Sequence, residues 1–220
     1  MKYGQFCPIA KSLELVGERW SMLVLREVLM GGRSFNQIQR GLGDISTAIL
    51  SKRLKWLEQC GLLTRHVPAG TNRAQYLPTP SAEDLQPVLM ALGDWGMKWT
   101  RHNLVSDDYD VQLLMLYLER SIIPERLPGP RTVICFAFTD LVEQPDWWIV
   151  IDGAHVEICD KDPGFAVSCW FRSTLQVMTD VWLGHDTYQR AIDSGALDMH
   201  GDAVLTGNVT HWLKCSDFRD

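Results

Sequence analysis

The sequence predicts an α+β protein with two domains of different character. Apolar residues recur at helical spacing through the first hundred residues, whereas the second half alternates like strands before it becomes helical again. Residues 1–105 hold 13 Lys and Arg against 8 Asp and Glu, while residues 106–220 hold 8 against 19. A net charge of +5 beside one of −11 indicates two domains with different partners. We therefore expect a first domain at 1–105, a helix and proline-rich linker at 106–130, and a second domain at 131–220.

Three helices are predicted before residue 41. The first opens at Cys7-Pro8, because proline suits the first helical position, and the next two span residues 19–30 and 34–40. Their expected core-facing residues are Ile9, Leu13 and Val16, then Trp20, Leu23, Val24 and Val28, then Phe35 and Ile38.

A fourth helix, residues 46–59, carries the most informative pattern in the chain. Ser46 is a good N-cap, and Gly61 suits the left-handed residue that commonly ends a helix. Helical spacing gives it one apolar face made of Ile49, Leu50, Leu54 and Leu57. An ordinary amphipathic surface helix fits this window equally well. The short helix and glycine-rich turn before it favour a helix-turn-helix, whose second helix enters the major groove.

The other face of this helix suits a nucleic acid. Small side chains at Thr47, Ala48 and Ser51 allow close approach to base edges, and Lys52 and Lys55 reach phosphates.

A hairpin follows, with strands expected at 62–67 and 73–77 around a loop of turn-forming residues. A hairpin in this position is a wing. Arg73 at its base is expected to enter a minor groove or meet a phosphate, and the alternative is a solvated hairpin charge.

A long helix is expected at 82–102, and it carries more apolar surface than a small winged domain buries alone. This pattern predicts a partner surface, and a homodimer would present two recognition helices to two half-sites. The apolar residues are Leu85, Val88, Leu89, Leu92, Trp95 and Trp99.

An ordered run of motifs over about residues 5–100 resembles the HxlR-type winged-helix transcriptional regulators. The motifs are Cys7-Pro8, Leu13, Gly17-Glu18-Arg19-Trp20, Leu25-Arg26-Glu27, Gly32-Arg33, Phe35, Ile45-Ser46, Leu50-Ser51, Arg53-Leu54, Leu57-Glu58, Gly61-Leu62, Tyr76 and Trp95-Gly96. The resemblance implies a bacterial homodimer that binds inverted-repeat double-stranded DNA through the helix from Ser46, with Arg53 beside phosphate. The sequence departs from the family pattern at Pro78 and Pro80, which stiffen the exit from the wing.

Cys7 has two interpretations. Several proteins of the family that the chain resembles use a cysteine here to sense oxidants, and a helix N-terminus favours a reactive thiolate. Its apolar neighbours Phe6 and Ile9 instead favour a packed, inert thiol.

The second half is predicted to contain a helix, a linker, four strands, and then helices around a last strand. The helix spans 109–121 and the linker 124–130. The first strands are expected at 131–138, 147–151, 154–159 and 165–171, followed by helices at 174–183 and 187–194, a strand at 197–200 and a helix at 203–213.

Residues 130–213 resemble the sterol-carrier-protein-like fold, through Ala191-Ile192, Gly195-Ala196-Leu197 and Gly201-Asp202. The resemblance implies an apolar tunnel between sheet and helices that admits a hydrophobic small ligand. The same aromatic side chains would equally fill such a space as core. Candidate lining residues are Phe136, Phe138, Trp170, Met178 and Trp182.

Catalysis finds no support in the sequence, which lacks a nucleophile elbow, a phosphate-binding glycine loop and an HExxH motif. Six scattered cysteines without a CxxC pair, no signal core and no membrane-length apolar run indicate a cytoplasmic protein without a metal or cofactor. We expect a DNA-binding transcriptional regulator. The alternative is a lipid- or small-molecule-binding protein whose winged domain serves dimerisation or protein contact.

Overall fold

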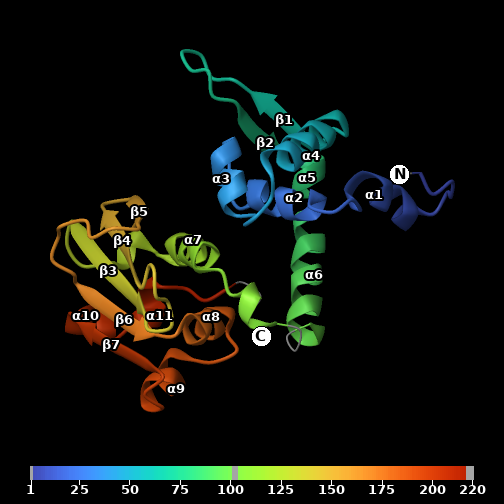
Figure 1. Ribbon diagram of the computed structural model, residues 1–220. Coiled ribbons are helices and arrows are strands. Elements are labelled where there is room, and N and C mark those ends of the chain that lie inside the picture. Colours follow the sequence, from blue (N-terminus) through green and yellow to red (C-terminus); the bar gives the residue numbers. More distant parts are fainter. Residues whose placement is uncertain (1, 101–103, 217–220) are drawn as a thin grey trace. The chain divides into compact units, whose positions relative to one another are not determined.

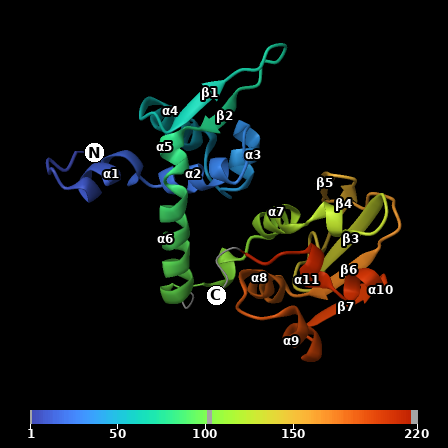
Figure 2. The ribbon, with the colours of Figure 1, turned by 180° about the vertical axis from the view of Figure 1, so that it is seen from behind.

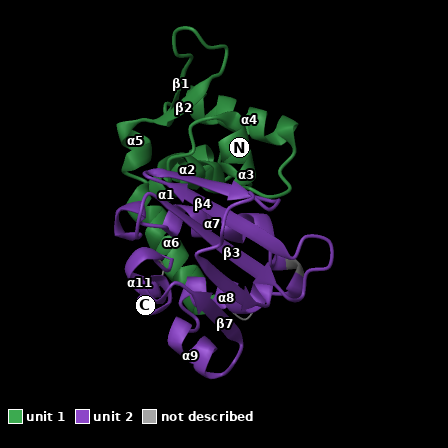
Figure 3. Ribbon diagram, turned by 90° about the vertical axis from the view of Figure 1, so that its left-hand side faces the viewer, with its two compact units in different colours: residues 1–100 green, residues 101–220 purple. Residues whose placement is uncertain are grey.

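The computed structural model describes residues 2–100 and 104–216, and the chain divides into two compact units, residues 1–100 and 101–220 (Figure 3). Unit 1 is helical apart from one hairpin (Figure 1). Its elements are α1 Pro8–Val16, α2 Ser21–Leu29, α3 Phe35–Arg40, α4 Thr47–Gln59, β1 Leu63–His66, β2 Gln75–Pro78, α5 Pro80–Glu83 and α6 Gln86–Trp99.

Local signals set the ends of α3 and α4 as expected. Ser34 caps α3 in a reciprocal capping box with Gln37. The Ser46 hydroxyl accepts the amide N–H of Ile49, and Gly61 adopts φ +73° just after α4. Both helices are therefore confirmed, together with the turn that joins them.

The wing hairpin is shorter than predicted but correctly placed. Strands β1 and β2 are antiparallel, and Arg65 pairs with Tyr76. The Tyr76 amide N–H donates to the Arg33 carbonyl at 2.8 Å, which joins the wing to the turn before α3. Arg73 precedes β2 and lies in the exposed loop.

The single long helix expected at 82–102 is wrong, because the structure has α5 and α6 with a turn at Asp84 and Leu85. Pro87 has no N–H to donate to the Glu83 carbonyl, and this removes one bond of a continuous helix. The end expected at 101–102 lies outside the described residues.

Unit 2 is a five-stranded sheet with its helices packed on one face (Figure 2). The strand order is β5-β4-β3-β6-β7, with β3 and β6 parallel and the other neighbours antiparallel. Its elements are η2 Ser106–Asp108, α7 Val111–Ser121, η3 Pro124–Arg126, β3 Arg131–Phe138, β4 Asp146–Asp152, β5 His155–Cys159, β6 Cys169–Ser173, α8 Leu175–Leu183, α9 Tyr188–Asp193, β7 Leu197–Gly201, α10 Ala203–Thr206 and α11 Val209–Trp212.

Residues 106–130, expected as a separate helix and linker, are instead part of unit 2. Helix α7 places Leu114, Met115 and Leu118 in the core of that unit. The proline-rich stretch is also attached, because the Arg126 guanidinium donates to the His211 carbonyl at 2.8 Å. The change of fold unit falls at residue 100, after α6.

Two other details of unit 2 differ from expectation. The fourth strand begins at Cys169 rather than residue 165, and the last helix is split into α10 and α11 at Gly207 and Asn208. The remaining strands and helices lie within two residues of their predicted positions.

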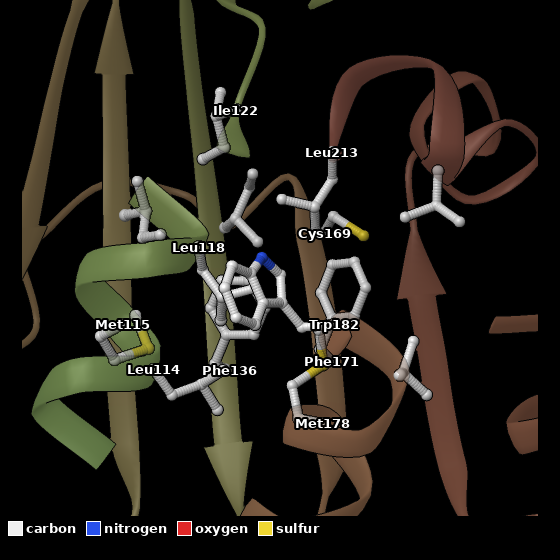
Figure 4. Close-up of a cluster of buried hydrophobic side chains, with 14 of the residues drawn as sticks. Leu114, Met115, Leu118, Ile122, Phe136, Cys169, Phe171, Met178, Trp182 and Leu213 are labelled. Atoms are coloured by element: carbon white, nitrogen blue, oxygen red, sulfur yellow. The ribbon is translucent and has the colours of Figure 1, made fainter. Parts of the chain in front are cut away.

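Four of the five expected ligand-lining residues share one face of the sheet, and the fifth does not. Phe136, Phe138, Met178 and Trp182 lie in the core between the sheet and its helices (Figure 4). Trp170 is on the opposite face, paired in register with Cys135 and stacked on His200, so its assignment to the same lining is wrong. The reason is that side chains alternate along β6, and Phe171 takes the inward position.

The inward aromatic side chains pack on one another. Phe136 stacks on Phe171 with 4.9 Å between ring centroids, and Trp182 stacks on Tyr117 at 4.7 Å. The Trp182 indole N–H donates to the Ser121 hydroxyl at 2.9 Å.

Candidate nucleic-acid interface

Helix α4 presents one buried face and one exposed polar face. Leu50, Leu54 and Leu57 are buried in the core of unit 1. The side chains expected to meet a nucleic acid are all exposed except that of Arg53: Thr47, Ala48, Ser51, Lys52 and Lys55. Ile49, expected on the buried face, is instead 42% exposed, because it lies at the edge of that face in the first turn. The exposed face therefore begins with small side chains and becomes basic one turn later.

The turn before α4 is fixed by a buried charge that sequence reasoning missed. The Glu27 side chain is fully buried and accepts hydrogen bonds from the Arg26 guanidinium at 2.8 and 3.0 Å. Arg26 also donates to the Gly41 carbonyl at 2.7 Å. A Cβ at Gly41 would overlap the Glu27 carboxylate, so only glycine allows this close approach. The pair joins α2 to the α3–α4 turn.

Arg53 differs from the two lysines of the same helix. Its side chain is only 11% exposed, and its guanidinium pairs with the Glu18 carboxylate in the α1–α2 connection. The neighbouring Trp56 indole N–H donates to the Leu15 carbonyl at 2.8 Å. Lys52 and Lys55 are thus exposed cations, whereas the largely buried Arg53 side chain pairs with a Glu18 side chain that is 43% exposed.

The wing carries more positive charge than Arg73 alone. Arg65 in β1 is exposed, as is Arg73 across the hairpin loop. The sequence signal for Arg65 is its polar side chain within the strand expected at 62–67, and in the structure only Leu63 of β1 is buried.

Helices α1 and α6 leave apolar faces uncovered in the single chain. Helix α6 buries no residue completely, and Val88, Leu92, Trp95 and Trp99 are each more than half exposed. Ile9 and Leu13 of α1, with Phe6 just before the helix, form a second exposed apolar row, so Ile9 and Leu13 are not core residues as expected. In α2, Leu23 is likewise exposed rather than inward.

Cys7 occupies the N-cap position of α1 and is half-buried. Its side chain makes no capping hydrogen bond, and its carbonyl accepts the Lys11 amide N–H at 3.0 Å.

A capped helix with a small, polar and basic face, held by a tight turn and followed by a basic hairpin, defines a winged helix-turn-helix DNA-binding domain. Comparison with known proteins agrees with this class. The HxlR-like helix-turn-helix family model matches residues 15–104.

An uncharacterized HTH-type transcriptional regulator of Mycobacterium tuberculosis is 34% identical over 139 residues, which cover 56% of this chain and 85% of that relative. The HTH-type regulator YvaP of Bacillus subtilis is 32% identical over 101 residues, or 45% of this chain and 94% of YvaP. The chain belongs to the HxlR-like family and is an HTH-type transcriptional regulator. Among solved structures, reduced YodB from B. subtilis aligns with 44% of this chain and 98% of its own, at 29% identity and a TM-score of 0.39.

Across residues 2–100 and 104–216, none of the helices combines the length and apolar character that crossing a bilayer requires. The same residues contain no group of three or more His, Cys, Asp or Glu side chains arranged to hold a metal ion.

Proposed function

We propose that the protein binds inverted-repeat operators as a homodimer whose two copies meet along α6 and α1. The supporting observation is the spacing of the exposed apolar residues on α6. Val88, Leu92, Trp95 and Trp99 follow one another at intervals of four, three and four, which is the seam of a helix that packs against another helix. A second copy is the partner with an identical seam, and the row on α1 supplies further apolar surface.

On this proposal α4 enters the major groove in each half-site. Starting from the N-cap Ser46, the small residues Thr47, Ala48 and Ser51 let the helix backbone approach base edges. Lys52 and Lys55 neutralise phosphates. Arg73 meets the DNA backbone or the minor groove from the wing. Arg53 lies beside a phosphate of the same half-site, and its pair with Glu18 holds its guanidinium in place.

The test is selection from a random duplex library, followed by mobility shifts on the selected sequence and on DNA upstream of the gene. We expect an inverted repeat bound by two copies of the chain. Binding of one copy to a single unrepeated site would contradict the dimer, and no selective binding would favour a ligand-binding protein with a winged dimerisation domain.

Ser51→Ala tests whether the exposed face of α4 reads bases directly. We expect it to change the preferred base at one position of each half-site by about 1 kcal/mol, because it removes a hydroxyl from a base edge. A uniform weakening on every sequence would contradict a base contact for Ser51.

We also propose that unit 2 is a sterol-carrier-protein-like domain that admits a hydrophobic ligand between sheet and helices. Its succession of helix, three antiparallel strands, crossover strand, helices and last strand supports this, beside the short motifs at Ala191 and Gly195. Trp182 lies in the core of unit 2 and stacks on Tyr117, so its fluorescence reports on a ligand between the sheet and the helices. Native mass spectrometry with a long-chain fatty acid tests the proposal. A bound adduct with altered Trp fluorescence supports it, and absence of an adduct at saturating ligand contradicts it.

A further inference from the structure

Two side-chain contacts fasten the recognition helix α4 to the C-terminal end of α1. Trp56 donates its indole N–H to the Leu15 carbonyl at 2.8 Å, although the two residues are 41 apart in the chain. One helical turn earlier, Arg53 pairs with Glu18, just after α1 ends. Both contacts come from the flank of α4 that separates its buried leucines from its exposed face.

The connection between α1 and α2 contains one strained residue and one position without room for a side chain. Trp20 has φ +77° and is the one non-glycine residue with positive φ among the residues described. A Cβ on Gly17 would lie 2.5 Å from the Leu13 carbonyl oxygen, so a side chain does not fit there. Backbone strain of this kind persists only where surrounding contacts impose it, and it is concentrated at functional sites. The strained segment carries Glu18 between these two positions.

Helix α1 has few other attachments within unit 1. It buries only Ala10 and Val16, and it extends away from the body formed by α2, α3 and α4 (Figure 1). The contacts at its C-terminal end therefore determine its direction relative to α4.

We propose that the segment from Leu15 to Trp20, through Trp56 and Arg53, sets the angle between α1 and α4 and thereby the spacing of operator half-sites. The proposal rests on the homodimer above, in which α1 belongs to the dimer surface and α4 to the DNA surface. In a symmetric dimer, any change in the angle between these helices is doubled, so the two recognition helices move apart or together. Trp56 and Arg53 are then positioning residues that select half-site spacing without touching a base.

The experiment compares the wild type with Trp56→Phe and Glu18→Gln on a library of inverted repeats whose central spacer varies by single base pairs. Trp56→Phe removes the indole N–H but keeps an aromatic ring, and Glu18→Gln removes the charge but keeps the shape. The wild type is expected to select a narrow range of spacers. Each variant is expected to bind the preferred spacer roughly tenfold more weakly and to accept neighbouring spacers almost equally, because one hydrogen bond or ion pair is lost in each of two copies.

Two further measurements separate this role from a general loss of stability. The base preference within each half-site should be unchanged, since α4 keeps its own exposed residues. Trp147→Phe is the matched control, because it removes an indole N–H bond to the Gln144 carbonyl in unit 2, 3.1 Å long, and should leave the spacer profile intact.

A dimeric variant with the wild-type spacer profile would overturn the proposal, as would altered base preference at unchanged spacing. If the wild type selects no inverted repeat, the proposed homodimeric function fails and this inference fails with it. If the wild type selects one spacing and both variants retain it, only the inference fails.

Discussion

The two units of this chain use their apolar side chains in opposite ways. Unit 2 buries most of its large apolar residues in a core between a sheet and helices, with Phe136, Phe171 and Met178 almost fully buried. A smaller cluster that contains Cys135 and Trp148 lies on the other face of the sheet. Unit 1 has a compact core around α4 but leaves the rows on α1 and α6 in solvent. Unit 2 therefore buries its main apolar face within itself, whereas the exposed rows of unit 1 are what the proposed homodimer would cover.

The two halves of the chain also differ in net charge. The basic excess of the first half includes the exposed Lys52, Lys55, Arg65 and Arg73 of α4 and the wing, whereas the acidic excess lies in the second half. DNA phosphates are attracted by the net positive charge of the first half and repelled by the net negative charge of the second, which favours contact through unit 1.

The largest expected effect is the difference in reactivity of two buried cysteines of unit 2 between the native and the unfolded protein. Burial, with smaller effects of Asp146 and Asp162, raises the pKa of Cys135 from its ordinary value of 9.0 to about 12, and burial with Asp202 does the same for Cys169. The difference corresponds to about 1,000-fold less thiolate at pH 8. Peptide-resolved alkylation at pH 8 should therefore modify both thiols at least that much more slowly in the native protein than in urea.

The same pKa shifts predict that the folded state loses stability at high pH. Because the folded pKa exceeds the unfolded one, the contribution of the neutral thiols is complete below pH 9 and is lost as the pH rises through about 12. Native alkylation of Cys135 at its rate in urea would contradict its complete burial. For Cys7, an ordinary titration curve with unchanged DNA binding after oxidation would assign the residue to packing rather than sensing.

Phe136→Ala tests whether the core of unit 2 is independent of unit 1. Phe136 is fully buried and stacked on Phe171, so truncation should lower the free energy of unfolding of unit 2 by about 3–5 kcal/mol. Hydrogen exchange read by mass spectrometry should show faster exchange across β3, β4 and β6, with α2 and α4 unchanged. Val142→Ala, at a 94% exposed position in the same unit, is the control and should change stability by less than about 0.5 kcal/mol. Equal loss of protection in both units would show that they unfold together.

Features of the fold that are set by residues close together in the chain could be predicted from the sequence, whereas those set by distant residues could not. The ends of α4 follow from Ser46 and Gly61, which act within one helical turn, and β3 was placed at its observed bounds by simple alternation. The break before α6 was also readable, because Pro87 lacks the necessary donor. The inward face of β6 was not, since Trp170 and Phe171 are both apolar and only the parallel pairing with β3 decides between them.

The same distinction between local and long-range signals applies to the candidate interface. The exposed residues of α4 follow from helical period, whereas the buried Arg26–Glu27 pair against Gly41 joins residues 15 apart and has no local signature. Arg53 was expected beside phosphate from its place in a motif, and its pairing with Glu18 depends on the tertiary path of the α1–α2 connection.

Trp95→Glu tests whether the open face of α6 is a dimer surface. Each of the two copies would place an unpaired carboxylate in the seam, so the dimer dissociation constant should rise at least 100-fold. Sedimentation velocity across a concentration series measures this, and operator binding should weaken in parallel. Val204→Glu adds the same charge at a 66% exposed apolar position of unit 2 and should leave assembly unchanged. An unaltered dimer in the Trp95 variant would place the interface elsewhere.

Lys52→Ala has the smallest expected effect. It tests whether this lysine of unit 1 binds a phosphate or reads a base. The side chain is exposed on α4, and as a phosphate contact it would contribute about one unit to the slope of log affinity against log salt in each protomer. A dimer on two half-sites should therefore lose about two units of slope, with all sequences weakened alike. Lys161→Ala, which removes an exposed cation from the acidic unit, should leave the slope unchanged or slightly strengthen binding. A loss of sequence preference at constant slope in the Lys52 variant would instead place that lysine against a base, and the division of α4 into base-reading and phosphate-binding residues would be wrong.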